Sequence, residues 1–182
     1  MRRTLLSLFL IMLCFAQAGL CHPMVPMVTE KTIGSKSYIV GSVSVKAPRE
    51  LVWKALNDYD GATSLFENLR ECKVLKDSGE TKLVKQVVKT GFVNLEYQIV
   101  STHKIDTIEF RSVKGRFQKF DGYWHIEPKS ENLTVVSYGL HVIGTSIFPT
   151  SFLRSRFRKY TPELLTDLRT KLEKRRPESK LF

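Results

Sequence analysis

Hydrophobic and polar residues alternate along much of the chain with the period of two that is typical of β-strands. The first such stretch covers residues 37–48, in which Ile39, Gly41, Val43 and Val45 alternate with more polar neighbours. Successive side chains of a strand point to opposite faces, so this pattern predicts a strand with one covered face. Further strand-like stretches follow at residues 72–77, 82–89, 91–101, 106–115, 119–128 and 132–144.

Helical spacing replaces the alternation in the segment that follows the first strand. Pro48 suits the first turn of a helix and Gly61 ends the run. The apolar residues between them recur at helical intervals: Leu51, Val52, Ala55 and Leu56. Residues 60–69 predict a second, shorter helical turn.

The C-terminal segment also has a helical period. Thr161 is predicted as the N-cap and Pro162 as the first helical position. An apolar stripe then follows: Leu164, Leu165, Leu168 and Leu172. The sequence therefore predicts a long helix that begins at Thr161.

The order of these elements predicts an α+β domain of the helix-grip type. We expect a curved antiparallel sheet of about six to seven strands wrapped around the long C-terminal helix, with two short helices after the first strand. Burying the apolar face of the sheet against the apolar stripe of the helix is the simplest way to cover both. A curved sheet of this kind can leave a cavity beside the helix.

The N-terminus has the pattern of a secretory signal peptide. Arg2 and Arg3 precede an apolar run from Leu5 to Phe15, and Ala16-Gln17-Ala18 supplies small residues for cleavage. The alternative is an uncleaved anchor. We expect residues 1–18 to be a cleaved signal, 19–36 an extended tail, 37–176 the domain and 177–182 a short tail, with the product exported to the periplasm or secreted.

Charge and cysteine content restrict the partners. Removing residues 1–18 lowers the net charge from +11 to +9, which favours anionic partners such as lipid head groups and, in an exported protein, argues against nucleic acid. Cys21 and Cys72 are free or form a disulfide, which export would permit. Asn132 begins a glycosylation sequon, Asn132-Leu133-Thr134. The oligomeric state is left open.

The sequence contains no recognisable catalytic or metal-binding pattern. The four histidines lack metal-ligand spacing, Cys72 has no neighbouring base, and no nucleophile elbow or phosphate-binding glycine loop is present. His125 and His141 fall opposite the apolar faces and are predicted to face solvent. We therefore expect no metal, no cofactor and no catalytic residue.

Three motifs carry a resemblance to a known family. Residues 47–59 read APRELVWKALNDY, residues 115–124 read GRFQKFDGYW, and Phe148-Pro149 leads into a basic segment. Together they resemble the START-like (helix-grip, SRPBCC) superfamily, and within it the polyketide cyclase/dehydrase and coenzyme Q-binding protein branch. The match covers Tyr38 to about Lys174. The resemblance implies the helix-grip fold and a site for a hydrophobic molecule. It does not identify the ligand, because this fold hosts many functions.

The inward-facing aromatic and aliphatic residues are the candidates for that site. They are either core or the wall of a cavity for a lipid, an isoprenoid or a quinone. The set is Trp53, Leu95, Tyr97, Phe110, Phe120, Trp124, Tyr138, Leu140, Phe157 and Leu168. Gly122 is expected to allow a bent strand or a close approach of the helix.

A basic segment precedes the predicted C-terminal helix and suggests peripheral contact with an anionic membrane. It contains Arg154, Arg156, Arg158 and Lys159 around Phe152 and Phe157. The simpler interpretation is a solvated helix face. Two functions from other classes also stay open. One is a small cyclase-like enzyme that uses Tyr97, Tyr138 or Ser137, and the other is a protein-interaction module with a filled core.

Overall fold

The computed structural model describes residues 25–175, which form one sheet and three helices. Helix α1 (Arg49–Asn57) and helix α2 (Ala62–Leu65) follow the second strand, and helix α3 (Thr150–Arg175) closes the domain. The strands are β1 (Met27–Ile33), β2 (Lys36–Val45), β3 (Leu69–Asp77), β4 (Thr81–Thr90), β5 (Val93–His103), β6 (Thr107–Lys114), β7 (Lys119–Ser130) and β8 (Leu133–Ile143).

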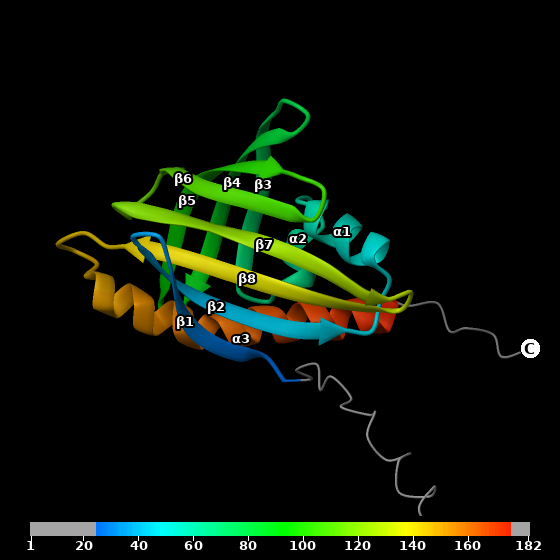
Figure 1. Cartoon of the computed structure of the whole chain (residues 1–182). Coiled ribbons are helices and arrows are strands. Elements are labelled where there is room, and N and C mark those ends of the chain that lie inside the picture. Colours follow the sequence, from blue (N-terminus) through cyan, green and yellow to red (C-terminus); the bar gives the residue numbers. More distant parts are fainter. Residues whose placement is uncertain (1–24, 176–182) are drawn as a thin grey trace, which may run out of the picture.

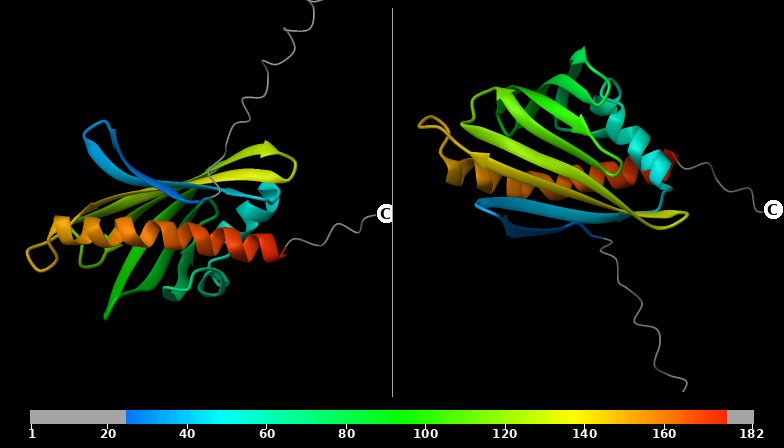
Figure 2. Two further views of the ribbon diagram at one scale, coloured as in Figure 1. Left: turned by 90° about the horizontal axis from the view of Figure 1, so that it is seen from below. Right: turned by 45° about the horizontal axis from the view of Figure 1, so that its top comes forward.

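The strands form one antiparallel sheet in the order β1-β2-β8-β7-β6-β5-β4-β3. The sheet curves, and α3 runs along its concave face from one end to the other (Figure 1; Figure 2). Most of the alternating residues predicted to face inward are buried in β2, β5, β7 and β8, and Trp124 of β7 is half-buried. The predicted helix-grip fold is confirmed. The two predicted short helices are also confirmed: α1 and α2 follow β2, which is the first strand predicted from the sequence.

Strand β1 was not predicted. It lies inside the segment expected to be an extended tail, and it pairs with β2 from Met27 opposite Ser42 to Ile33 opposite Lys36. Gly34, with φ of 59°, lies in the turn between the two strands. Nearly every side chain of β1 is exposed, Val28 being the half-buried exception, because β1 is an edge strand. Because neither face of β1 is covered, its sequence has no hydrophobic alternation that would predict a strand. With β1 the sheet has eight strands, compared with the six to seven expected.

The predicted start of the C-terminal helix is wrong. Helix α3 begins at Thr150, and Pro162 lies inside it. Thr161 is fully buried, and its hydroxyl donates to the Phe157 carbonyl at 2.8 Å. Residues 151–160, expected to lie before the helix, form its first half and bury Leu153 and Phe157 against the sheet.

Glycine sets how closely α3 approaches the sheet, at a different position from the one expected. A Cβ at Gly41 of β2 would lie 2.6 Å from Thr161 Cγ2 and 2.7 Å from Leu165 Cδ1, so the helix backbone packs there because the side chain is absent. A Cβ at Gly122 would lie 2.1 Å from the Gly139 carbonyl oxygen and 2.6 Å from Cζ of Phe110, so Gly122 accommodates the neighbouring strands and not the helix. Along its length, helix α3 contacts mainly β2 and β8, and its backbone stands away from β4, β5 and β6.

Candidate functional site

A small cavity lies where α3 stands away from the sheet. Its volume is about 90 Å³, and its walls come from the inner faces of β3 to β8, from α1, α2 and the turn between them, and from α3. Within the part of the chain that the structure describes, no charged side chain lines it. The lining residues are Leu56, Tyr59, Ala62, Phe66, Leu69, Gln86, Val88, Tyr97, Ile99, Ser101, Ile108, Phe110, Phe120, Trp124, Tyr138, Tyr160 and Leu164.

Half of the predicted site residues line this cavity. They are Tyr97, Phe110, Phe120, Trp124 and Tyr138. The others lie elsewhere: Leu95, Leu140 and Leu168 are buried in the core, Phe157 packs on Phe120 with ring centroids 5.5 Å apart, and Trp53 is half-buried beside His103. The inward orientation predicted for the strand residues is correct, and their role toward a ligand stays a prediction.

Aromatic stacking fills most of the space around the cavity. Trp124 packs on Tyr138 with ring centroids 4.6 Å apart and stacks on Phe66 of the α2 segment at 6.0 Å. Phe120 contacts both Tyr97 and Phe117 at 4.8 Å. Of the aromatic residues of the 115–124 motif, Phe120 and Trp124 line the cavity and Phe117 packs against the core, whereas the Tyr123 ring lies 6.0 Å from that of Tyr38 on the other face of the sheet.

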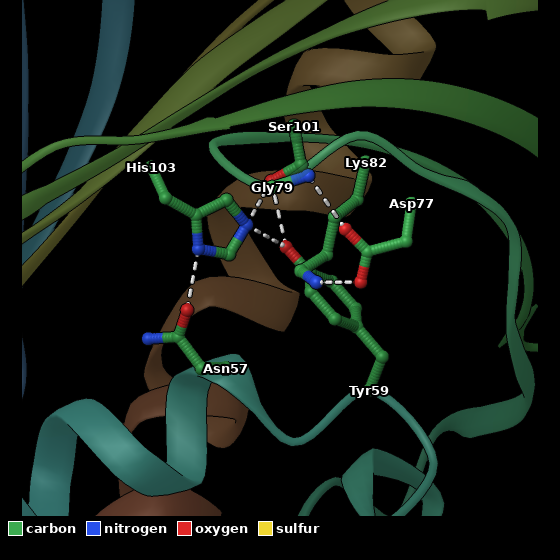
Figure 3. A network of polar contacts seen from close by, with 7 residues as sticks. All are labelled: Asn57, Tyr59, Asp77, Gly79, Lys82, Ser101 and His103. Atoms are coloured by element: carbon green, nitrogen blue, oxygen red, sulfur yellow. Dashed lines mark hydrogen bonds and ion pairs between the residues drawn. The ribbon is translucent and has the colours of Figure 1, made fainter.

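One end of the cavity carries a chain of polar groups (Figure 3). The Tyr59 hydroxyl lies 2.7 Å from Ser101 Oγ and 2.9 Å from His103 Nε2. On the other side of the imidazole, Nδ1 contacts Asn57 Oδ1. Tyr59 and Ser101 line the cavity, and His103 and Asn57 continue the chain toward the surface.

Burial shifts the pKa values of two groups of this chain in the direction that favours their neutral forms. It raises the pKa of Tyr59 to about 12, and the hydrogen bond with Ser101 opposes the shift. Burial also lowers the pKa of His103 below its ordinary value, and the positive charge of Lys82 adds to this while Asp77 opposes it. Lys82 and Asp77 form an ion pair beside the chain. The structure thus places a neutral phenol and a neutral imidazole in contact.

No pattern in the sequence indicates this polar chain, because its members lie far apart along the polypeptide. Tyr59 and His103 are 44 residues apart, and Asn57 and His103 are 46 apart. Of the polar candidates considered from the sequence, Tyr97 and Tyr138 line the cavity, whereas Ser137 pairs with Ser42 at 2.8 Å on the other face.

Two histidines outside the cavity have different environments. His125 is exposed, as predicted. His141 is buried, so the prediction that it faces solvent is wrong. Its Nδ1–H donates to the Ser37 carbonyl at 2.9 Å, and its ring lies 5.6 Å from that of Tyr38. The outer face is covered there by neighbouring side chains, which alternation along a single strand does not reveal.

The four basic residues predicted to contact a membrane lie in the first half of α3 and divide into two pairs. Arg154 and Arg158 both contact the Glu30 carboxylate of β1, with Arg154 Nη2 at 3.0 Å. Arg156 and Lys159 are exposed, and the Arg156 guanidinium lies over the Phe152 ring at 5.4 Å. The ion pairs with Glu30 attach the edge strand to the helix.

Exposed apolar side chains gather near the start of α3. Phe92 in the β4–β5 turn and Ile147 in the β8–α3 loop are almost fully exposed, and Phe152 is partly so. A Cβ at Gly91 would lie 3.7 Å from the Arg156 guanidinium, so the β4–β5 turn reaches the helix. We call Phe92, Ile147, Phe152, Arg156 and Lys159 the basic-apolar end.

Residues 25–175 contain no cluster of metal ligands and no membrane-spanning helix. No group of three or more His, Cys, Asp or Glu side chains is arranged to hold a metal ion there. None of the helices described is long and apolar enough to cross a bilayer. Cys72 is buried, which raises the pKa of its thiol to about 11, and it accepts a hydrogen bond from Gln86 at 3.6 Å. Cys21 and the predicted signal peptide lie outside the described residues.

Solved structures with this fold come from bacteria and humans. An aromatase/cyclase from Streptomyces sp. R1128 has a TM-score of 0.73 and 15% identity, covering 79% of this chain and 97% of that one. A protein from Thermus thermophilus has a TM-score of 0.70 and 18% identity, covering 77% and 99%. The lipid transfer and protein localization domain of human StarD13 has a TM-score of 0.67 and 16% identity, covering 81% and 84%.

Comparison with protein-family models identifies the family, which the low identities to solved structures do not. No curated protein matches the chain. The family model described as polyketide cyclase / dehydrase and lipid transport matches residues 45–169, which run from the end of β2 to the last third of α3. This span covers more than half of the chain and includes every side chain that lines the cavity. The chain therefore belongs to the polyketide cyclase/dehydrase and lipid transport family.

Proposed function

We propose that the protein binds a hydrophobic molecule, such as a lipid, an isoprenoid or a quinone, in the cavity between the sheet and α3. The observation that carries this proposal is the uncharged, largely aromatic lining of the cavity. Apolar walls with a few placed polar groups are typical of small-molecule sites. Binding would be driven by removing apolar ligand surface from water, at about 25 cal/mol per Å² before the costs of ordering.

The cavity must widen to accept such a ligand. At about 90 Å³ it is smaller than typical ligand pockets, which occupy roughly 300–1,000 Å³. Helix α3 contacts mainly β2 and β8, so the opposite wall, made by β4, β5 and β6, is joined to the helix through side chains around the cavity. Displacing Phe66 and Trp124, which stack at the α2 side, would enlarge the cavity without breaking a strand pair.

We further propose that residues 1–18 direct export and that the basic-apolar end contacts an anionic membrane. Exposed aromatic and aliphatic side chains beside exposed cations are the features of an interfacial membrane contact. Phe157, next to Arg156 in α3, contacts both Phe117 and the cavity-lining Phe120. A ligand that entered here would pass between bilayer and cavity with little exposure to water.

A small enzyme is the second candidate, and one observation favours it. The neutral His103 imidazole contacts the Tyr59 hydroxyl at the cavity wall, where it is placed to accept a proton. Among the described residues, the lining offers no charged group to stabilise a charged transition state, which favours binding over catalysis.

The test of ligand binding is to purify the protein from its native host, extract it with organic solvent and analyse the extract by mass spectrometry. A carrier is expected to yield one class of hydrophobic molecule in stoichiometric amount. An empty extract, together with no binding of a hydrophobic fluorescent probe, would contradict the proposal and favour the interaction module.

A further inference from the structure

The orientation of Asn57 fixes the direction of the polar chain. Its Nδ2 donates to the Trp53 carbonyl at 2.8 Å, so its Oδ1 is the atom that faces the imidazole. An amide oxygen only accepts hydrogen bonds. The hydrogen between Asn57 and His103 must therefore be carried by His103 Nδ1.

A neutral imidazole carries a single N–H, so Nε2 of His103 is an acceptor. The Tyr59 hydroxyl, 2.9 Å away, donates to it. The Tyr59 oxygen then accepts the hydrogen of Ser101 Oγ at 2.7 Å, because Ser101 Oγ lies 3.4 Å from Nε2 and is the poorer partner for that nitrogen. Each donor hydrogen of the chain points from the cavity toward the surface.

Ser101 ends the chain on the cavity side. Its side chain is buried and lines the cavity together with Tyr59. Since its hydrogen is committed to Tyr59, its oxygen offers lone pairs and no donor to a bound molecule. The oxygen of a ligand carbonyl or ether at this end would lie against Ser101 Oγ, and both atoms only accept there. Burying such a ligand would leave both oxygens without a hydrogen bond.

We propose that the ligand is an apolar molecule with a hydroxyl group, and that this hydroxyl donates to Ser101 Oγ. This inference rests on the proposed function and adds the chemical class of the ligand. Tyr97, Tyr138 and Tyr160 also line the cavity. Their hydroxyls lie outside the oriented chain, so they do not impose the same selection.

Three aromatic probes of similar shape test the proposal: 2-naphthol, which can donate a hydrogen bond, naphthalene, which has no polar group, and 2-methoxynaphthalene, which can only accept. Their affinities for the protein are measured by equilibrium dialysis near pH 7.5, above the ordinary pKa of histidine. One neutral hydrogen bond predicts that 2-naphthol binds about 3- to 10-fold more tightly than naphthalene. The methoxy compound is expected to bind no more tightly than naphthalene.

Two variants test whether Ser101 causes the preference for 2-naphthol. In Ser101→Ala the preference for 2-naphthol is expected to fall to about 1, with thermal unfolding as the check on folding. Tyr138→Phe removes a different cavity hydroxyl and is expected to keep the preference. If Ser101→Ala does not fold, the wild-type comparison alone still overturns the proposal when 2-naphthol binds no more tightly than naphthalene.

The outcomes separate this inference from the proposed function. Equal binding of all three probes, or a preference that survives in Ser101→Ala, overturns the hydroxyl proposal and leaves the hydrophobic site supported. A preference for 2-methoxynaphthalene also overturns it. Failure of all three probes to bind overturns both the hydroxyl proposal and the proposed site.

Discussion

At the scale of single residues, His103 links the cavity to solution pH. Its environment holds the pKa of the imidazole below the ordinary value near 6.5, through burial first and the Lys82 charge second, while Asp77 opposes them. The backbone N–H of His103 also donates to the Glu80 carbonyl at 2.8 Å, which ties the end of β5 to the β3–β4 turn. The folded protein therefore resists a proton that the unfolded chain accepts.

The free energy of unfolding is expected to fall as pH drops from about 7.5 through the ordinary histidine pKa. In that window the unfolded chain binds more protons than the native one, so stability rises with pH, and the dependence on His103 ends below its folded pKa. Urea unfolding at a series of pH values measures this slope. His103→Gln should reduce the slope and His125→Gln, at an exposed position, should not. Equal slopes in both variants would contradict the assignment.

Gly41 allows a close approach between the sheet and helix α3. Gly41→Ala is expected to lower the free energy of unfolding by about 1–3 kcal/mol, because the new methyl group would overlap Thr161 and Leu165. Chemical denaturation measures the loss. Ser42→Ala, at the next residue on the opposite face, should cost less, since it removes one hydrogen bond to Ser137. A Gly41→Ala protein as stable as the wild type would show that α3 can shift freely.

At the scale of elements, the two-residue period of the sequence correctly predicted on which face of the sheet the strand residues lie. Phe120, Trp124 and Tyr138 lie on the inner face as their alternation indicated. Strand β1 escaped prediction because an edge strand with both faces exposed has no hydrophobic pattern. The helix start was misplaced because Thr-Pro-Glu is also a typical N-terminus, and only the packing of Leu153 and Phe157 shows that the helix begins earlier.

Part of the candidate site was beyond sequence reasoning for a different reason. Hydrophobic period identifies which face a residue occupies, whereas the chain from Ser101 to Asn57 depends on how α1 and β5 meet in space. Asn57 ends α1 and His103 ends β5, and no local pattern connects two element ends. Tertiary packing alone brings them together.

Helix α3 tolerates Pro162 at a cost. Proline lacks the N–H that would donate to the Arg158 carbonyl, so one helical hydrogen bond is missing. Pro162→Ala is expected to raise the free energy of unfolding by about 1–2 kcal/mol, after allowance for the greater freedom of the unfolded chain. Ser155→Ala, exposed in the same helix, serves as the control and should change it by less than about 0.5 kcal/mol. A loss of stability in Pro162→Ala would mean that the proline shapes the helix for packing.

At the scale of the whole molecule, the basic-apolar end predicts where a membrane is contacted. Phe92→Asp combined with Ile147→Asp is expected to reduce binding to vesicles that contain phosphatidylserine by about 10-fold or more, because two exposed apolar side chains are replaced by charges of the same sign as the lipid. Vesicle co-sedimentation measures the binding.

Ile105 supplies the matched control for this surface. It is similarly exposed but lies in the turn that follows β5, whereas Phe92 lies in the turn that precedes this strand. Ile105→Asp should leave vesicle binding unchanged. Equal loss in Ile105→Asp and in the double variant would indicate a charge effect that does not depend on position.

The uneven packing of α3 divides the sheet into two parts that should open at different rates. Because α3 contacts mainly β2 and β8, amide hydrogens there are expected to exchange with deuterium only through global unfolding, and those of β4, β5 and β6 through smaller openings. A bound ligand would bridge the two parts, so loading should slow exchange in β4 to β6 selectively. The gain in protection would then report the occupancy of the cavity without any knowledge of the molecule inside it.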